Sequence, residues 1–185
     1  MSTPKSSDLS NLLKTCQDSV SRGGVGLETG VHTGRATAVL MDALSPSRLV
    51  LIDPWATDPA FKNRAFAPKL SDGNLAKAED VVRSTFGDHD SVEILKGQSA
   101  DILAGLEKGG FDWAYLDGCK YYAQLMGDFE RCFTALKPGG AIFGAGLSWG
   151  PQLGFPVRAA LRAFARRINP PPELIERGAC FALVL

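Results

Sequence analysis

Residues 25–37, VGLETGVHTGRAT, combine an acid with two glycines at a spacing that suits ligand binding. Glu28 ends a short apolar run, and Gly30 and Gly34 follow it before a helical pattern begins. Glycine lets the backbone turn sharply and lets a ligand lie against it. The helix that follows offers free N–H groups and a partial positive charge, which suit a carboxylate or a phosphate. The segment therefore predicts a binding turn with an acid beside it.

A second acid ends the next apolar run, SRLVLID. Asp53 follows Gly30 by about 20 residues, the separation at which a strand-end acid accepts hydrogen bonds from ribose hydroxyls in dinucleotide folds. Dinucleotide sites usually read G-x-G-x-x-G, whereas this chain reads E-x-G-x-x-x-G. Glu28 would accept the ammonium of an amino-acid tail, directly or through water. The pattern favours S-adenosylmethionine over a nicotinamide dinucleotide. The alternative is a plain strand-to-helix turn in which Glu28 caps the backbone.

Strands and helices are expected to alternate along a single domain over residues 1–185, with a leading helical segment within 1–22. Strands are expected at 23–28, 47–53, 91–97, 111–118 and 139–146, helices at 7–20, 34–44, 71–86, 99–109, 121–136 and 156–168, and a closing hairpin in ELIERG and CFALVL. Such alternation predicts a parallel sheet covered on both faces. Its ligands lie beyond the carboxyl ends of the strands.

The composition excludes several classes of protein. The chain has 185 residues, and its 20 basic residues balance 20 acidic ones, which gives no reason to expect nucleic acid or an anionic membrane as a partner. No apolar run approaches the ~20 residues that cross a bilayer, and the first residues lack the apolar core of a secretory signal. The four cysteines are scattered, which indicates neither a zinc site nor a disulfide framework. A cytoplasmic protein is expected.

Five blocks resemble the class I S-adenosylmethionine-dependent methyltransferases: LETGVHTGRAT, LVLIDPW, ILKGQSADIL, FDWAYLDGCKYY and LKPGGAIF. They are most similar to a group of small-molecule methyltransferases, of the sugar and natural-product O-methyltransferase kind, that read D-G-x-H-x-Y after the fourth strand. The resemblance covers about residues 24–145. It implies an α/β, Rossmann-like, doubly wound, mostly parallel seven-stranded sheet with the last strand antiparallel. It also implies S-adenosylmethionine as the cofactor.

Carried over by position, the resemblance assigns roles to individual residues. Glu28, Gly30 and Gly34 match the cofactor loop, and Asp53 matches the ribose acid. Trp55 beside it would either cover the cofactor or pack under the loop at 54–70.

Two further positions concern the adenine and the methyl-transfer centre. Gln98 and Ser99 match the segment that borders the adenine, although Ser99 could instead be the N-cap of its helix. Asp117 matches the acid that ends the fourth strand, where it would contact the cofactor and position the acceptor.

The chain departs from the group's pattern at two places. Lys120 replaces the histidine, so it would be a base, a clamp for an anionic acceptor, or a solvated side chain. Gly146 and Leu147 stand after the fifth strand, where metal-dependent relatives carry ligands. Since Asp117 alone is a poor magnesium site, we expect no catalytic metal.

The expected activity is therefore methyl transfer to a small-molecule acceptor without a metal, with Asp117 and Lys120 as the candidate catalytic residues. One alternative is a catalytically inactive methyltransferase-like binding or partner module. Another is a nicotinamide-dependent reductase, which the loop spacing disfavours. The sequence leaves the acceptor, and whether the protein forms an oligomer, undecided.

Overall fold

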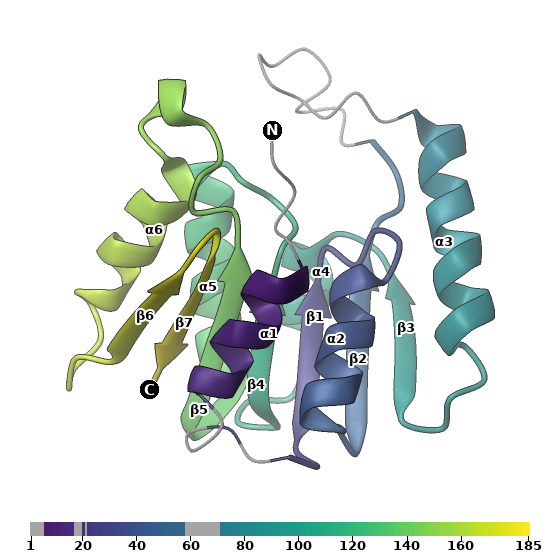
Figure 1. The fold of residues 1–185 in the computed structure, drawn as a ribbon, viewed down its shortest axis with the longest axis horizontal. Coiled ribbons are helices and arrows are strands. Elements are labelled where there is room, and N and C mark those ends of the chain that lie inside the picture. Colours follow the sequence, from purple (N-terminus) through teal and green to yellow (C-terminus); the bar gives the residue numbers. More distant parts are fainter. Residues whose placement is uncertain (1–5, 17–19, 21, 58–70) are drawn as a thin grey trace.

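The computed structural model describes residues 6–16, 20, 22–57 and 71–185. The helices are α1 (Ser6–Thr15), α2 (Arg35–Leu44), α3 (Asp72–Phe86), α4 (Ser99–Ala104), α5 (Tyr122–Ala135) and α6 (Pro156–Ala165), with a short 3₁₀ helix η1 (Pro151–Leu153). The strands are β1 (Val25–Thr29), β2 (Arg48–Asp53), β3 (Val92–Lys96), β4 (Phe111–Leu116), β5 (Leu136–Ala145), β6 (Glu173–Arg177) and β7 (Cys180–Val184). Figure 1 shows their arrangement.

Within these residues the seven strands form one sheet in the order β3-β2-β1-β4-β5-β7-β6. Strands β1 to β5 run parallel to one another, whereas β7 pairs with both β5 and β6 in the antiparallel sense. The expected fold class, a doubly wound sheet with a reversed last strand, is confirmed. The strand order reverses between β1 and β4, so the carboxyl ends of these two strands are where a ligand is expected to bind.

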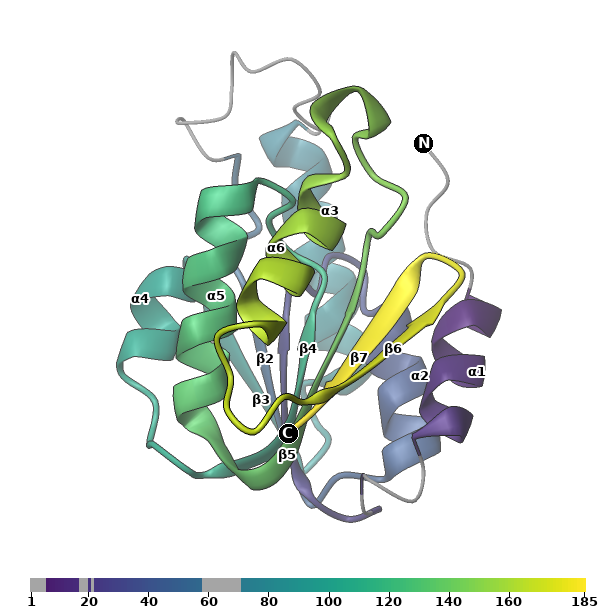
Figure 2. The ribbon, with the colours of Figure 1, turned by 90° about the vertical axis from the view of Figure 1, so that its left-hand side faces the viewer.

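Helices cover both faces of the sheet, as Figures 1 and 2 show together. One layer of buried side chains joins α1, α2 and α3 to the sheet, and the other joins α4, α5 and α6 to the opposite face. Strands buried on both faces read as near-continuous apolar runs, which explains why LVLI and WAYL show no polar alternation.

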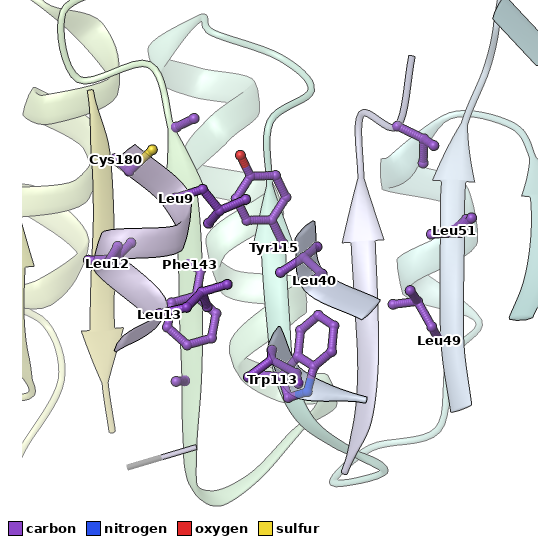
Figure 3. Close-up of a cluster of buried hydrophobic side chains, with 14 of the residues drawn as sticks. Leu9, Leu12, Leu13, Leu40, Leu49, Leu51, Trp113, Tyr115, Phe143 and Cys180 are labelled. Atoms are coloured by element: carbon purple, nitrogen blue, oxygen red, sulfur yellow. The ribbon is translucent and has the colours of Figure 1, made fainter. Parts of the chain in front are cut away.

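Figure 3 shows part of the layer under α1 and α2, where Leu9 and Leu40 lie against Trp113 and Tyr115 of β4. Trp113 pairs across the sheet with Gly26, and a Cβ atom built on that glycine would lie 2.1 Å from the indole ring. The glycine therefore makes room for the largest side chain of the core, and this explains an otherwise weak strand residue in β1.

Several ends of elements follow from local chemistry. The Ser71 hydroxyl accepts a hydrogen bond from the Asn74 N–H and so caps the start of α3. Helix α4 is shorter than the predicted 99–109, because the chain already turns at Gly105. Strand β5 begins at Leu136 rather than at 139, since the KPGG segment joins the strand through an irregularity in the pairing with β4.

The remaining predicted elements differ from the structure by a few residues at their ends. Helix α6 ends at Ala165, three residues before the predicted end at 168. Most of the loop predicted at 54–70 lies outside the described residues, as does part of the predicted helix at 7–20. None of the helices in the described part of the chain is long and apolar enough to cross a membrane.

Candidate cofactor site

The turn after β1 meets the turn after β4 through the main chain. Gly30 has a φ of 82°, and its N–H donates to the Ile52 carbonyl of β2 at 2.9 Å. A Cβ atom built on Gly30 would lie 2.2 Å from the Gly118 nitrogen and 2.6 Å from the Asp117 carbonyl carbon. Only glycine fits this position, because any side chain would displace the opposing backbone. The structure thus brings the glycine turn and Asp117 to the same edge of the sheet.

Asp53 joins the end of β2 to the glycine turn. One carboxylate oxygen accepts the His32 N–H at 2.9 Å, and the other accepts the Trp55 N–H at 2.7 Å. Burial raises the pKa of the Asp53 carboxyl, and these backbone hydrogen bonds oppose the rise. The side chain keeps 8% of its surface exposed. Each oxygen retains a further lone pair, so the carboxylate can still accept hydrogen bonds from a ligand.

Trp55 lies in the core rather than over an open surface. It is 3% exposed, has a φ of 40°, and donates its indole N–H to the His32 carbonyl at 2.8 Å. Trp55 was expected either to cover the cofactor or to pack, and its burial in the core is that of a packing residue. Its side chain braces the turn that carries His32, whose own side chain is exposed.

Gly34 gives α2 an uncapped start. With a φ of 76° it is the N-cap residue, and no side chain caps this end among the described residues. A Cβ atom here would lie 2.5 Å from the Phe86 ring of α3, so the glycine also admits that ring. The first N–H groups of α2 face the same turn as Gly30, which suits an anionic group.

Glu28 is completely buried, which leaves no surface for direct contact with an ammonium. Its Oε2 accepts the Thr37 hydroxyl of α2 at 2.7 Å, whereas Oε1 has no hydrogen-bond partner among the described residues. Burial raises the pKa of Glu28 to about 8, and the nearby charges of Asp117 and Asp53 add to the rise. The carboxyl is therefore mostly protonated near neutral pH. It has no exposed surface through which to touch a ligand, and its hydrogen bond with Thr37 joins β1 to α2.

Replacing Glu28 with glutamine tests this account of the buried acid. The native state holds its proton up to pH 8, whereas the unfolded state releases it near 4.5, so the free energy of unfolding should fall between these two pH values. Each unit of pKa difference is worth about 1.4 kcal/mol. Urea unfolding should show that Glu28→Gln matches the wild type at pH 5 and exceeds it by a few kcal/mol at pH 8.

Glu130→Gln, which changes an exposed carboxylate of α5, is the matched control and should leave the pH dependence of the wild type intact. Equal slopes for Glu28→Gln and the wild type would show that Glu28 is ionised in the native protein.

Lys120 connects the ends of β4 and β5. Its ammonium forms an ion pair with the Asp117 carboxylate and also donates to the Asp117 carbonyl at 3.0 Å and to the Ala145 carbonyl at 3.2 Å. These three acceptors match the three N–H groups of a lysine side chain. The stem of Lys120 runs beside Gly146, where a Cβ atom would lie 3.2 Å from it. Lys120 is therefore not a solvated side chain, because these three oxygens hold its ammonium in place.

Gln98 and Ser99 lie at the start of α4, next to Asp53. The Gly97 N–H donates to the Asp53 carbonyl at 3.1 Å, which holds this turn against the end of β2. The N-cap residue is Gln98, so the alternative in which Ser99 caps the helix is wrong. Instead, the Ser99 hydroxyl donates to the Asp128 carboxylate of α5 at 3.0 Å.

Two residues of the site's surroundings, Thr37 and Asp128, were not predicted. Asp128 lies three residues after Leu125 and four before Cys132, at the spacing that places all three on one face of a helix, and both neighbours are apolar and buried. An acid on the apolar face of a predicted helix could therefore have marked Asp128 as a residue with a special role. No comparable indication in the sequence marks Thr37, because only the fold places it against Glu28.

The segment after β5 rises beside the same edge, as Figure 1 shows for η1. Tyr121 contacts Trp149 edge to face, with ring centroids 5.7 Å apart. Leu153 and Phe155 expose much of their apolar surface. Among the described residues no group of three His, Cys, Asp or Glu side chains is placed to hold a metal ion.

Taken together, the strand order and the turns after β1, β2 and β4 define the class of the S-adenosylmethionine-dependent methyltransferases. A family model described as "Methyltransferase domain" matches residues 27–144. The chain therefore belongs to the methyltransferase domain family, and its cofactor is S-adenosylmethionine. This assignment replaces the nicotinamide-dependent alternative.

Solved structures share the fold at low sequence identity. The O-methyltransferase NovP has a TM-score of 0.69 and 18% identity, over 97% of this chain and 78% of that one. An O-methyltransferase from Bacillus cereus in complex with SAH (S-adenosylhomocysteine) has a TM-score of 0.64 and 20% identity, over 100% and 83%. Cofactor-bound Rv0187 from MTB has a TM-score of 0.62 and 19% identity, over 100% and 82%. No curated protein matches the sequence significantly.

Proposed function

We propose that this protein transfers a methyl group to a small-molecule acceptor by direct displacement, without a divalent metal. The observation that carries the proposal is the convergence of the Gly30 turn, Asp53 and Asp117 at one edge of the sheet. S-adenosylmethionine supplies an electrophilic methyl group on a sulfonium. The protein has to bind that molecule, hold the acceptor in line at about 3–3.5 Å, and exclude water.

The charges near the turn suit a cationic ligand. Asp53 and Asp117 both lie close enough to Glu28 to raise its pKa, and Lys120 forms an ion pair with one of these two acids, Asp117, at the end of β4. A sulfonium and an ammonium would both be favoured by this excess of acidic groups. Glu28 contributes through the field of its carboxyl or through a bridging water, because it has no exposed surface.

The remaining contacts follow from position. Asp53 would accept hydrogen bonds from the ribose hydroxyls, and the N–H groups at the start of α2 would bind the carboxylate of the amino-acid tail. Gln98 and Ser99 would border the adenine. Trp55 would support this arrangement from beneath, by bracing the turn at His32.

At the methyl-transfer end, Asp117 and Lys120 form a fixed ion pair between β4 and β5. Lys120 supports a role in holding Asp117 in place better than proton removal or capture of an anionic acceptor, because its ammonium already donates to three oxygens. Gly146 offers no side-chain ligand, which supports a reaction without a metal. The arginines of α6 support a small acceptor over nucleic acid, since Arg158 and Arg162 both pair with Glu176.

Calorimetric titration of chelator-treated protein with S-adenosylhomocysteine tests the proposal. We expect binding in the micromolar range, and we expect excess EDTA or added Mg²⁺ to change neither affinity nor the turnover found in an acceptor panel by more than about twofold. No heat and no thermal shift at millimolar ligand would contradict cofactor binding. Activity that EDTA abolishes and Mg²⁺ restores would contradict the metal-independent mechanism. Binding without turnover against any acceptor would favour a binding module.

A further inference from the structure

The turn between β3 and α4 is fixed from two sides. The Gly97 N–H donates to the Asp53 carbonyl at 3.1 Å, which ties the turn to β2. The Ser99 hydroxyl lies 3.0 Å and 3.2 Å from the two carboxylate oxygens of Asp128, which ties the turn to α5. The position of the turn is thus set by Asp53, the proposed ribose acid, and by α5, the helix that follows Asp117 and Lys120.

Asp128 is an unusual residue for its place. It is 2% exposed on the inward face of α5, beside Phe129 and Cys132. Burial raises the pKa of its carboxyl to about 6, against the opposing effects of the Ser99 hydrogen bond and the Arg131 charge. A buried carboxylate with so little compensation costs stability, and an apolar side chain of similar volume would cost less. Its presence therefore points to a role other than packing.

Helix α4 needs such a contact. It has six residues, from Ser99 to Ala104, and a helix this short has little stability of its own. Figure 2 shows α4 beside α5 on one face of the sheet. Apolar contacts through Leu103 hold the far end of α4. The hydrogen bond from Ser99 acts at the first residue of the helix, where the turn faces Asp53.

We propose that Asp128 is a positioning residue for the adenine side of the cofactor site, acting through the Ser99 hydroxyl. By holding Ser99 it sets the backbone of residues 98–100, on which the adenine is expected to lie. The inference rests on the proposed function, because the adenine position comes from that function. It assigns to α5 a part in cofactor binding that the strand-end residues alone do not explain.

Titrations of four variants with two probes, S-adenosylhomocysteine and adenosine, test this role. We expect Ser99→Ala and Asp128→Ala each to weaken both probes by about fivefold, less than the full effect of a lost hydrogen bond to a charged group, because this contact acts on the ligand through the turn. The double variant should be no weaker than either single variant, since both remove the same contact. Asp128→Asn keeps an oxygen that accepts from Ser99, so it should bind within about twofold of the wild type.

Two controls separate positioning from general damage. Glu130→Ala removes an exposed carboxylate from the same helix and should bind both probes like the wild type. Glu28→Gln should weaken S-adenosylhomocysteine more than adenosine, because adenosine lacks the amino-acid tail. Equal losses for the two probes would place the effect of Asp128 on the adenosine half of the ligand.

Distinct outcomes overturn the inference. If the wild type binds but Ser99→Ala and Asp128→Ala stay within twofold of it, Asp128 has no positioning role and the proposed function stands. Losses that multiply in the double variant would also overturn it, because the two residues would then act independently. If the wild type binds neither probe, the proposed function fails and this inference fails with it. If Asp128→Ala does not fold, the titrations of Ser99→Ala and Asp128→Asn test the inference by themselves.

Discussion

Replacing Gly30 with alanine is expected to weaken cofactor binding severely and to lower the melting temperature markedly. The residue has a φ of 82°, which costs a residue with a Cβ atom about 1 kcal/mol. The larger effect comes from the Cβ atom itself, which would lie 2.2 Å from the Gly118 nitrogen and 2.4 Å from its Cα. These are main-chain atoms of the facing turn, so they cannot rotate away as a side chain would.

The turns after β1 and β4 would have to separate, and both border the proposed cofactor site. We expect the affinity for S-adenosylhomocysteine to fall by at least about a hundredfold, or about 3 kcal/mol. A similar loss of stability would lower the melting temperature by roughly 6–12 °C for a domain of this size. Calorimetry and thermal unfolding measure the two effects.

Gly139→Ala is the matched control. Gly139 has a φ of 79°, and a Cβ atom built on it meets nothing within 4 Å. It shares the backbone strain of Gly30 without the collision, so it should lose about 1 kcal/mol of stability and no affinity. If Gly30→Ala behaved like Gly139→Ala, the contact between the two turns would not constrain the site.

Asp53→Ala is expected to reduce the affinity for S-adenosylhomocysteine by about a hundredfold, because it removes acceptors for the ribose and for the backbone. The carboxylate binds the N–H groups of His32 and Trp55, so the turn itself should loosen when it is lost. A loss of affinity alone would therefore not identify a ribose contact. Calorimetric titration with adenosine and with 2′,3′-dideoxyadenosine makes that distinction.

The wild type should prefer adenosine over the dideoxy compound by about tenfold or more, which is the effect of two hydrogen bonds to a carboxylate. In Asp53→Ala this preference should disappear, while binding of both compounds weakens further through the loosened turn. Asp53→Asn keeps one acceptor oxygen, so its preference for adenosine should lie between those of the wild type and Asp53→Ala. An unchanged preference in Asp53→Ala would assign Asp53 to the turn alone.

The sequence was sufficient for the fold because local patterns and long-range pairing agree. Apolar runs such as LVLI become strands buried on both faces, and the hairpin of β6 and β7 follows two short runs separated by Gly178. Residues at β5 were harder to place. The KPGG segment resembles a turn, and it becomes part of the strand only because Phe111 of β4 pairs with Leu136.

The placement of the turns was predictable from the sequence, because it depends mainly on the main chain. Gly30, Gly34 and Asp53 lie together, as their spacing indicated. Side-chain states were not predictable, because they depend on neighbours that the fold supplies. Glu28 loses all contact with solvent only once α2 covers β1, and Lys120 gains its third acceptor only from the end of β5.

The contact between Gly30 and Gly118 has a consequence for engineering this scaffold. The surface on which the ligand is proposed to rest consists of peptide groups rather than side chains, so we expect substitutions of residues that do not hold these turns to leave its shape intact. The segment that contains Trp149, Leu153 and Phe155 does not take part in that contact, and it exposes apolar surface, so we expect substitutions there to alter acceptor preference without moving the turns. Libraries of variants confined to this segment would change the side chains next to the acceptor and leave the Gly30–Gly118 contact unchanged.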